Sequence, residues 1–337
     1  MAHAHNSSSK RSRIAFGIAI LICGITAGWL LKGTAGQRQI ASDQQITRVR
    51  KNSPAYKFIN PLLFIENPKD SSPEYENLRK AIGSSVAAIA SSHAADSISV
   101  YFKDLNSGRW TGVNEDAKYE PSSMLKVALL IADLKIAEGN TDFLLKEVPY
   151  THGQDSVQYY QPAKKLPEGS YAIHQLLESM IIDSDNDAAN ALFKDNPNGF
   201  DELYRDLHLP NPPQDMSDFM SARSYSVLFR TLYNSSYLSW PVSEKALDLL
   251  SLTNFKKGLV AGLPKDTRIS HKFGENTTIF PDGQSEQREL HDCGIVYYPE
   301  APYFICVMTR GTDFAKLESA IASVSKSVYD FRGSMKK

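Results

Sequence analysis

Residues 121–126 of this 337-residue chain read PSSMLK, and the strongly apolar stretch from Met124 to Glu138 predicts a helix. Ser123 and Lys126 are three residues apart at its start, which places both side chains on one face. A serine hydroxyl is a weak nucleophile, and a lysine whose pKa is lowered by burial can activate it as a base. The pattern indicates a catalytic serine–lysine pair or a solvent-facing helix start, since this spacing is common by chance.

A second polar signal, SDN at residues 184–186, interrupts an apolar helical stretch that runs from 171 to 193. Its functional interpretation is a proton relay at Ser184 and, at Asn186, a hydrogen-bonding group for a substrate amide. The alternative is a helix boundary at which Ser184 or Asp185 is the N-cap.

A third signal is HKFGE at residues 271–275. On a strand, Lys272 would present a cation to a ligand, and Gly274 would permit close approach of the backbone. The alternative is an edge-strand lysine followed by a bulge glycine.

The hydrophobic patterns around these signals predict one α/β domain from about residue 74 to the end of the chain. The predicted helices are 74–92, 124–138, 171–193 with a break near 183–186, 225–233, 243–252 and 314–331. The predicted strands are 97–103, 109–113, 294–298 and 303–309. Strands near both ends with helices between them indicate a sheet built from both parts of the chain.

The N-terminal end is typical of an exported protein. Residues 14–31 carry no charge and follow Lys10, Arg11 and Arg13. This length nearly spans a bilayer, and the basic flank favours a cytoplasmic N-terminus. We therefore expect residues 1–33 to be a single-pass membrane anchor, with a cleaved signal peptide and secretion as the alternative. Residues 34–73, rich in proline and polar residues, are expected to be a tether for an extracytoplasmic domain.

Composition excludes several other classes of protein. Charged residues make up 22% of the chain and hydrophobic residues 42%, which is typical of a globular protein. The net charge of −1 gives no indication of nucleic-acid binding. The histidines show no metal-ligand spacing, so no metal or cofactor is predicted. Cys293 and Cys306 flank the last predicted hairpin, either as a disulfide or as two buried thiols.

Taken together and in this order, the three signals resemble the motifs of class A β-lactamases and penicillin-binding proteins. The resemblance covers about residues 74–332 and includes YYQP at 159–162. It implies the β-lactamase-like fold, with an antiparallel sheet flanked by helices and an additional all-α subdomain. The all-α subdomain would carry Ser123 and Ser184, and the α/β subdomain would carry Lys272.

The resemblance also implies a role for each matching residue. Ser123 would be the acylated nucleophile, Lys126 its base, and Ser184 the relay of a proton to the leaving nitrogen. Lys272 would hold Ser184 and add positive potential. Asn186 would hold the side-chain amide of the substrate, and the backbone at Gly274 and Glu275 would also bind the substrate. The backbone N–H groups of Ser123 and Glu275 would form the oxyanion hole. Tyr159 or Tyr160 would form a wall of the site.

Two departures from the family's pattern affect this interpretation. Phe273 stands where the family has a Ser or Thr whose hydroxyl binds the substrate's carboxylate. The family's loop glutamate, in a Glu-x-x-Leu-Asn motif, has no counterpart between residues 190 and 272. Asp215 and Asp218 are possible substitutes for the glutamate, although we expect Asp215 or Ser217 to cap the following helix.

The sequence thus predicts a membrane-tethered serine hydrolase that forms an acyl-enzyme at Ser123 with β-lactams or related amides. One alternative is a penicillin-binding or D-alanyl peptidase-type enzyme that acts on cell-wall peptides and releases lactams slowly. Another is a non-catalytic cell-envelope binding module. The complete serine–lysine set argues against the module, while Phe273 and the missing glutamate weaken the case for an efficient β-lactamase.

Overall fold

The computed structural model describes residues 48–50, 57–59, 62–65, 75–153, 158–280 and 286–334. The chain divides into two compact units, Met1–Ile46 and Thr47–Lys337, and all described residues belong to the second. The anchor predicted within residues 1–33 lies outside the described residues. Among the helices that are described, none is both long and apolar enough to cross a membrane.

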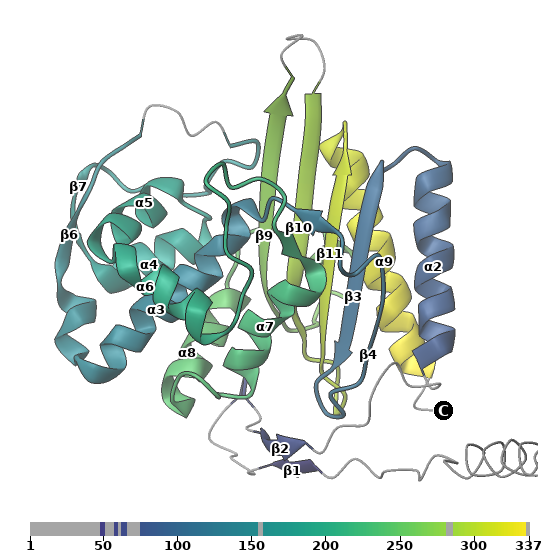
Figure 1. Cartoon of the computed structure of the whole chain (residues 1–337), viewed down its shortest axis with the longest axis horizontal. Coiled ribbons are helices and arrows are strands. Elements are labelled where there is room, and N and C mark those ends of the chain that lie inside the picture. Colours follow the sequence, from purple (N-terminus) through teal and green to yellow (C-terminus); the bar gives the residue numbers. More distant parts are fainter. Residues whose placement is uncertain are drawn as a thin grey trace, which may run out of the picture. The chain divides into compact units, whose positions relative to one another are not determined.

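A five-stranded antiparallel sheet, in the order β4-β3-β11-β10-β9, lies at the centre of the second unit (Figure 1). Its strands are β3 (Ser97–Asp104), β4 (Trp110–Val113), β9 (Ile269–Ile279), β10 (Glu286–Val296) and β11 (Tyr303–Gly311). The sheet joins both parts of the chain, as predicted, although β10 begins eight residues before the predicted strand at 294. β9 is an edge strand, so one side of its backbone faces the helices instead of another strand.

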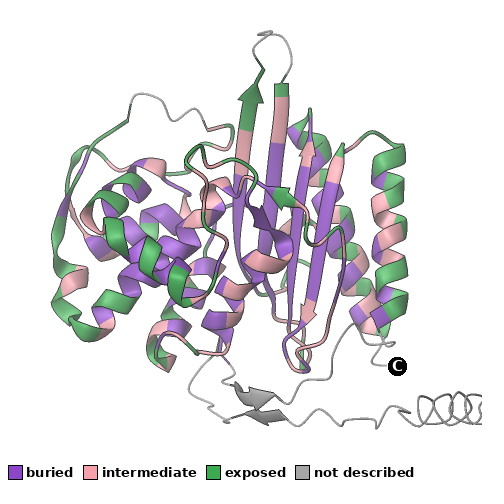
Figure 2. Ribbon diagram, viewed as in Figure 1, coloured by how far each residue is buried: buried purple, intermediate pink, exposed green. Residues whose placement is uncertain are grey.

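Helices cover both faces of the sheet, which makes its strands apolar on both sides. α2 (Glu76–Ser91) and α9 (Phe314–Ser334) pack together against one face, and α7 (Ala222–Tyr233) packs against β11 on the other. Val100 and Phe102 of β3 enter the core with α2 and α9, whereas Tyr101 enters the opposite core with Phe229. Figure 2 shows the strands buried along most of their length.

The remaining helices form the predicted all-α part, beside β9 (Figure 1). They are α3 (Lys126–Gly139), α4 (Ile173–Ile182), α5 (Asn186–Asp195), α6 (Pro197–Asp206) and α8 (Trp240–Ser251). The predicted break near 183–186 is confirmed, because Asp185 caps α5 by accepting the backbone N–H groups of Asp187 and Ala188. The sequence interpretation missed α6, which begins at Pro197 with Asn196 as its cap.

Short elements connect these parts. They are the antiparallel pairs β1 (Arg48–Arg50) with β2 (Leu62–Ile65), β5 (Lys118–Tyr119) with β8 (Met220–Ser221), and β6 (Glu147–Tyr150) with β7 (Gly169–Ala172), and the 3₁₀ helices η2 (Ser122–Leu125), η3 (Thr141–Leu145) and η4 (Val260–Gly262). The predicted cap at Asp215 or Ser217 is wrong: Ser221 caps α7 by accepting the N–H of Ser224 at 3.1 Å. The β5–β8 pairing explains the difference, because it delays the start of α7 by several residues.

Part of the segment predicted as a tether is docked onto the domain. Phe58 and Ile59 are buried, and Phe58 packs edge-on against Tyr297. The carboxylate of Glu244, on α8, accepts the backbone N–H groups of Lys57, Phe58 and Ile59. A single carboxylate therefore satisfies three successive backbone donors, which fixes this short segment more firmly than its composition suggests.

The structure resolves the alternatives for the two cysteines near the last hairpin. Cys293 on β10 lies directly opposite Cys306 on β11, and the two sulfurs form a fully buried disulfide with an S–S distance of 2.01 Å. The bond links adjacent strands next to the edge strand β9.

Candidate active site

The segment that carries Ser123 is held between α3 and β9. Ser122 adopts a positive φ of 48°, an uncommon conformation that turns the chain into η2. The hydroxyl of Tyr225 donates to the carbonyl of Met124 at 2.9 Å. Gly274 of β9 packs so closely here that an added Cβ would lie 2.6 Å from the carbonyl oxygen of Pro121. Gly274 thus permits a close approach to the nucleophile's own backbone, whereas the approach to a ligand for which it was predicted stays a prediction.

Lys126 is the centre of the polar contacts. Its Nζ lies 2.9 Å from the Oγ of Ser123, 2.6 Å from the Oδ1 of Asn186, and 2.6 and 3.2 Å from the carbonyl oxygen and Oγ of Ser184. Burial lowers the pKa of Lys126 to about 7, against the opposing influence of Asp185 and Glu275. At neutral pH a substantial fraction of this amine is therefore free to accept a proton from Ser123.

Ser184 lies between two lysines. Its Oγ is 2.8 Å from the Nζ of Lys272 and 3.2 Å from that of Lys126. Ser184 has a positive φ of 58°, and such backbone strain clusters at functional sites. The adjacent Asp185 fixes the turn, because its Oδ2 accepts the hydroxyls of Ser179 at 2.8 Å and Tyr150 at 2.9 Å.

Lys272 reaches this cluster from β9 and is fully buried. Besides Ser184, its Nζ contacts the carbonyl oxygen of Phe273 at 3.2 Å. Burial, and then repulsion by Lys126, lower the pKa of Lys272 well below its ordinary value. This direction works against the positive potential expected from Lys272.

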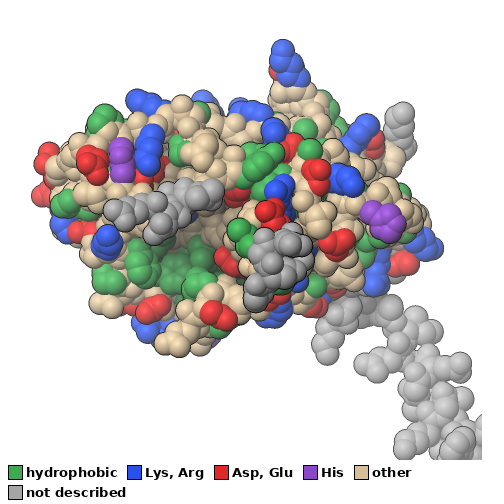
Figure 3. Space-filling view, turned by 90° about the horizontal axis from the view of Figure 1, so that it is seen from above, with side chains coloured by type: hydrophobic (Ala, Val, Ile, Leu, Met, Phe, Trp, Pro, Cys, Tyr) green, Lys and Arg blue, Asp and Glu red, His purple; other side chains and the backbone are tan. Residues whose placement is uncertain are grey.

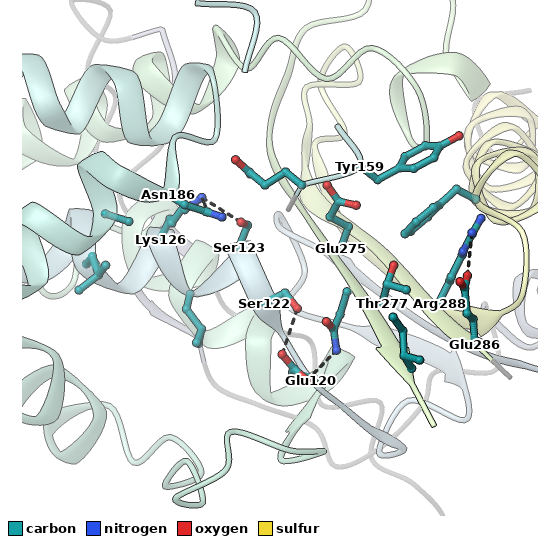
Figure 4. A pocket seen from close by; sticks show the side chains of 17 residues that line it. Glu120, Ser122, Ser123, Lys126, Tyr159, Asn186, Glu275, Thr277, Glu286 and Arg288 are labelled. Carbon is teal, nitrogen blue, oxygen red and sulfur yellow. Dashed lines mark hydrogen bonds and ion pairs between the residues drawn. The ribbon is translucent and has the colours of Figure 1, made fainter. Parts of the chain in front are cut away.

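A cavity of about 860 Å³ opens over Ser123. Ser123, Lys126 and Asn186 lie on its helical side, and Glu275 and Thr277 lie on the strand side (Figure 4). Its lining comprises Glu120, Ser122, Ser123, Leu125, Lys126, Leu129, Gln158, Tyr159, Asn186, Ala189, Glu275, Asn276, Thr277, Ile279, Glu286, Arg288 and Phe314. The sequence interpretation missed more than half of these residues, because they share no motif and become neighbours only through the fold.

The two tyrosines have different positions. Tyr159 lines the cavity and stacks on Phe314, with ring centroids 4.4 Å apart. Tyr160 lies behind the wall: its hydroxyl donates to Glu318 at 2.6 Å, and its backbone N–H donates to the carboxylate of Glu275 at 2.8 Å. The predicted wall is therefore Tyr159, and Tyr160 supports it.

Phe273 does not line the cavity. It is buried against Phe255, with stacked rings 4.1 Å apart, and it meets Tyr160 edge-on. The position where the resembled family places a hydroxyl is thus part of an apolar cluster below the cavity wall. It offers no hydrogen bond to a substrate carboxylate.

Carboxylates outnumber exposed cations along the described cavity wall. Burial raises the pKa of both Glu120 and Glu275. Glu120 accepts the side-chain amide of Asn276 at 2.8 Å, and Arg288 is paired with Glu286 at 2.9 Å. Each of these groups thus has a protein partner within the described residues.

Neither candidate substitute for the missing glutamate lines the cavity. Asp218 makes two contacts with the guanidinium of Arg310, at 2.6 and 2.7 Å. Asp215 accepts the backbone N–H and the hydroxyl of Ser217 at 3.1 and 2.8 Å. Both carboxylates stabilise the loop between α6 and β8. Within the described residues, no group of three or more His, Cys, Asp or Glu side chains is arranged to hold a metal ion.

An antiparallel sheet beside an all-α part, with a Ser-x-x-Lys pair and a second serine meeting between them, is the arrangement that the resemblance to β-lactamases predicts. The model of the family described as "Beta-lactamase enzyme family" matches residues 81–331, and the chain belongs to this family. A curated relative, a β-lactamase of Streptomyces albus G, is 24% identical over 264 residues, covering 70% of this chain and 80% of the relative.

Solved structures agree on the fold. A structure of PBP-A is 23% identical and has a TM-score of 0.64, covering 80% of this chain and 99% of PBP-A. A β-lactamase from Xanthomonas campestris pv. campestris is 21% identical with a TM-score of 0.62, covering 75% of this chain and 98% of the other. The predicted family resemblance and fold class are thereby confirmed. A variant of PBP-A has also been solved as an acyl-enzyme complex with penicillin-G.

Proposed function

We propose that this hydrolase-family protein forms an acyl-enzyme at Ser123 with β-lactams or related amides. The observation that carries the proposal is the Lys126 amine, which has a pKa of about 7 and lies 2.9 Å from the Oγ of Ser123. An amine that is partly neutral and in hydrogen-bond contact with a hydroxyl meets both requirements for a general base. A binding module would have no need for this costly buried amine.

The proposed reaction begins when Ser123 Oγ attacks the carbonyl carbon and Lys126 takes its proton. The backbone N–H groups of Ser123 and Glu275 would stabilise the oxyanion, as the family resemblance implies. Ser184 then donates a proton to the leaving nitrogen as the C–N bond breaks. Because Ser184 Oγ contacts both Lys126 and Lys272, the lysines can replace that proton. The product is an ester at Ser123.

Hydrolysis of that ester is the step for which the site is poorly equipped. A deacylating water needs a base, and neither loop carboxylate, Asp215 or Asp218, lines the described cavity. This arrangement favours the alternative of a penicillin-binding or D-alanyl peptidase-type enzyme with a long-lived acyl-enzyme. The penicillin-G complex of the PBP-A variant supports the same alternative by analogy. That the natural substrate of such an enzyme is a cell-wall peptide is part of the same proposal.

Export of the catalytic domain is also part of the proposal. The buried Cys293–Cys306 disulfide supports it, since such bonds persist in oxidising compartments outside the cytoplasm. The charge pattern of residues 10–31 supports a membrane-inserted N-terminus. Protease added to intact spheroplasts of a producing cell should digest the domain, and full protection would contradict this topology.

The test of function is to mix the domain with a chromogenic cephalosporin and to follow both absorbance and intact mass. We expect a burst of one equivalent and then a slow phase. Loss of general-base assistance slows deacylation by roughly 10²–10⁴-fold. Ser123→Ala should abolish the mass increase, whereas Ser122→Gly should retain it. Rapid linear turnover would reveal a deacylation base that the geometry does not identify, and absence of any adduct would refute the proposed function.

A further inference from the structure

Two side chains of β10 contact the backbone of the residue that leads into the turn of Ser123. Glu289 and His291 are two residues apart on a strand, so both point to the same face of the sheet. The carboxylate of Glu289 accepts the backbone N–H of Glu120 at 3.3 Å, and the Nε2 of His291 lies 3.0 Å from the carbonyl oxygen of Glu120. Both polar groups of this backbone unit, three residues before Ser123, are thus held by one strand.

The surroundings of His291 determine which of its ring nitrogens carries the proton. The backbone N–H of Thr309 donates to Nδ1 at 3.2 Å, so Nδ1 is an acceptor and the proton resides on Nε2. Nε2 therefore donates to the carbonyl oxygen of Glu120. The ring is fully buried and meets Tyr119 edge-on, with ring centroids 5.3 Å apart, which fixes its orientation.

A chain of charged contacts supports Glu289 from outside. Its second carboxylate oxygen accepts the Nε of Arg310 at 2.5 Å, and both carboxylate oxygens of Asp218 hold Arg310 in turn. Burial acts to raise the pKa of Glu289, but the contacts with His291 and Arg310 outweigh it and lower that pKa. Glu289 is therefore a stable, ionised acceptor for the N–H of Glu120.

The segment that these contacts hold is strained. Ser122 has a φ of 48°, and a residue in this conformation persists only where its surroundings over-determine it. Gly274 is the register partner of His291, and an added Cβ there would lie 2.6 Å from the carbonyl oxygen of Pro121. The carbonyl groups of Glu120 and Pro121 thus rest against two neighbouring strands, immediately before the strained residue.

We propose that Glu289 and His291 form a positioning clamp on the backbone of Glu120. The clamp holds the turn that places the Oγ of Ser123 2.9 Å from the Nζ of Lys126. The inference rests on the proposed function, since the geometry that it protects is the one that acylation needs. Loss of the clamp should slow the chemical step and leave substrate binding unchanged, because binding groups elsewhere in the cavity remain in place.

The clamp lies below the surface that a substrate would reach. Seen from above, hydrophobic side chains gather over the helical part beside a hollow (Figure 3). Glu289 and His291 are only 4% and 0% exposed, and neither is among the described residues that line the cavity. Their effect on Ser123 is therefore transmitted through the backbone and involves no contact with the substrate.

Two variants of His291 differ in the ring nitrogen that they imitate. The amide nitrogen of glutamine reaches about as far from the backbone as Nε2, whereas that of asparagine reaches only as far as Nδ1. We expect His291→Gln to retain most of the acylation rate. His291→Asn should lower the maximal rate constant of acylation by roughly 10²-fold, the cost of a misplacement of about 1 Å, with the half-saturating substrate concentration unchanged.

Stopped-flow mixing of the full-length protein with a chromogenic cephalosporin, over a range of concentrations, measures both quantities. Partial unfolding would lower the amplitude of the burst, whereas a misplaced Ser123 lowers its rate constant. Ser325→Ala is the matched control, because the hydroxyl of Ser325 on α9 is also buried and donates to the carbonyl oxygen of Leu259 at 2.8 Å. This variant should retain the rate constant.

The protonation of His291 tests the clamp on the unmodified protein, so this measurement does not depend on whether a variant folds. Nitrogen-15 NMR of the imidazole rings distinguishes protonated from unprotonated ring nitrogens. We expect the proton of His291 on Nε2, with its signals assigned by their loss in His291→Gln. A proton on Nδ1 would overturn the clamp.

The kinetic outcomes are distinct. If the unmodified protein gives no adduct on Ser123, the proposed function fails and the clamp's role in acylation fails with it. If the unmodified protein is acylated and His291→Asn reacts equally fast, the proposed function stands and the clamp is refuted. The clamp is also wrong if His291→Gln is as slow as His291→Asn, or if His291→Asn changes only the half-saturating concentration.

Discussion

The chemistry of Lys126 yields the sharpest quantitative prediction. Burial lowers its pKa from 10.5 to about 7. At pH 7 about half of the amine is then neutral, whereas with the ordinary pKa the neutral fraction would be roughly 3 × 10⁻⁴. The structure thus supplies a free base about a thousandfold more often than an exposed lysine would. The acylation rate should reach a plateau above pH 7 and fall about tenfold per pH unit well below it.

Replacement of Lys126 by arginine tests directly whether the neutral amine of Lys126 is the base for acylation. A guanidinium is effectively always protonated, so it retains a positive charge beside Ser123 but cannot act as a base. We expect Lys126→Arg to slow acylation by roughly 10²–10⁴-fold and to remove the inflection near pH 7. Lys135→Arg is the matched control, since Lys135 lies on the solvent side of the same helix and pairs with Glu138.

The assay is single-turnover stopped-flow with a chromogenic cephalosporin between pH 5 and 9, on both variants and the unmodified domain. Circular dichroism confirms that each variant is folded. Near-normal acylation by Lys126→Arg would rule out Lys126 as the base. A pH profile of the unmodified domain that is flat across this range would refute the link between burial and catalysis, even if the variant is inactive.

Two further predictions concern stability. Glu244→Gln should weaken the docking of residues 57–59 by roughly 1–3 kcal/mol, because an amide accepts fewer hydrogen bonds than a carboxylate. Hydrogen exchange of the backbone amides of residues 57–59 should then accelerate about tenfold or more. Unchanged exchange would contradict the role of Glu244. Burial raises the pKa of Asp133 from 3.8 to about 7, so the folded state holds a proton that the unfolded state has lost, and stability should fall as pH rises from about 4 to 7. Asp133→Asn should remove this contribution, so the free energy of unfolding in urea should change less between pH 5 and pH 8 in the variant than in the unmodified domain. An equal change in the two proteins would contradict this role of Asp133.

Much of the helical part of the site was predictable, because its signals are local. Ser123 and Lys126 are adjacent on a helix by their spacing alone. The polar run at 184–186 had to interrupt its helix, and Asp185 is a residue that caps helices well. Such features depend on backbone geometry within one or two turns, which a single sequence encodes directly.

The part of the site that β9 contributes could not be predicted from local sequence patterns. The contact of Lys272 with Ser184 joins residues 88 positions apart in the chain. The inward direction of Phe273 follows from the register of β9 and from its aromatic partners Phe255 and Tyr160, which lie far from it in the chain or outside any motif. Glu120 carries no motif, and its contact with Asn276 of β9 joins residues 156 positions apart in the chain. The pKa shifts likewise follow from burial, which is a property of the whole fold.

The loop at residues 207–219 bears directly on the expected lifetime of the acyl-enzyme. Its carboxylates, Asp215 and Asp218, are held by Ser217 and Arg310, and none of these residues lines the cavity over Ser123. A water that attacks an ester at Ser123 would therefore receive no help from a carboxylate of this loop, and loss of general-base assistance slows such a step by roughly 10²–10⁴-fold. On the proposed function, intact mass followed over time after penicillin treatment should show a lasting adduct on Ser123. Rapid loss of that adduct would show that another group activates the water.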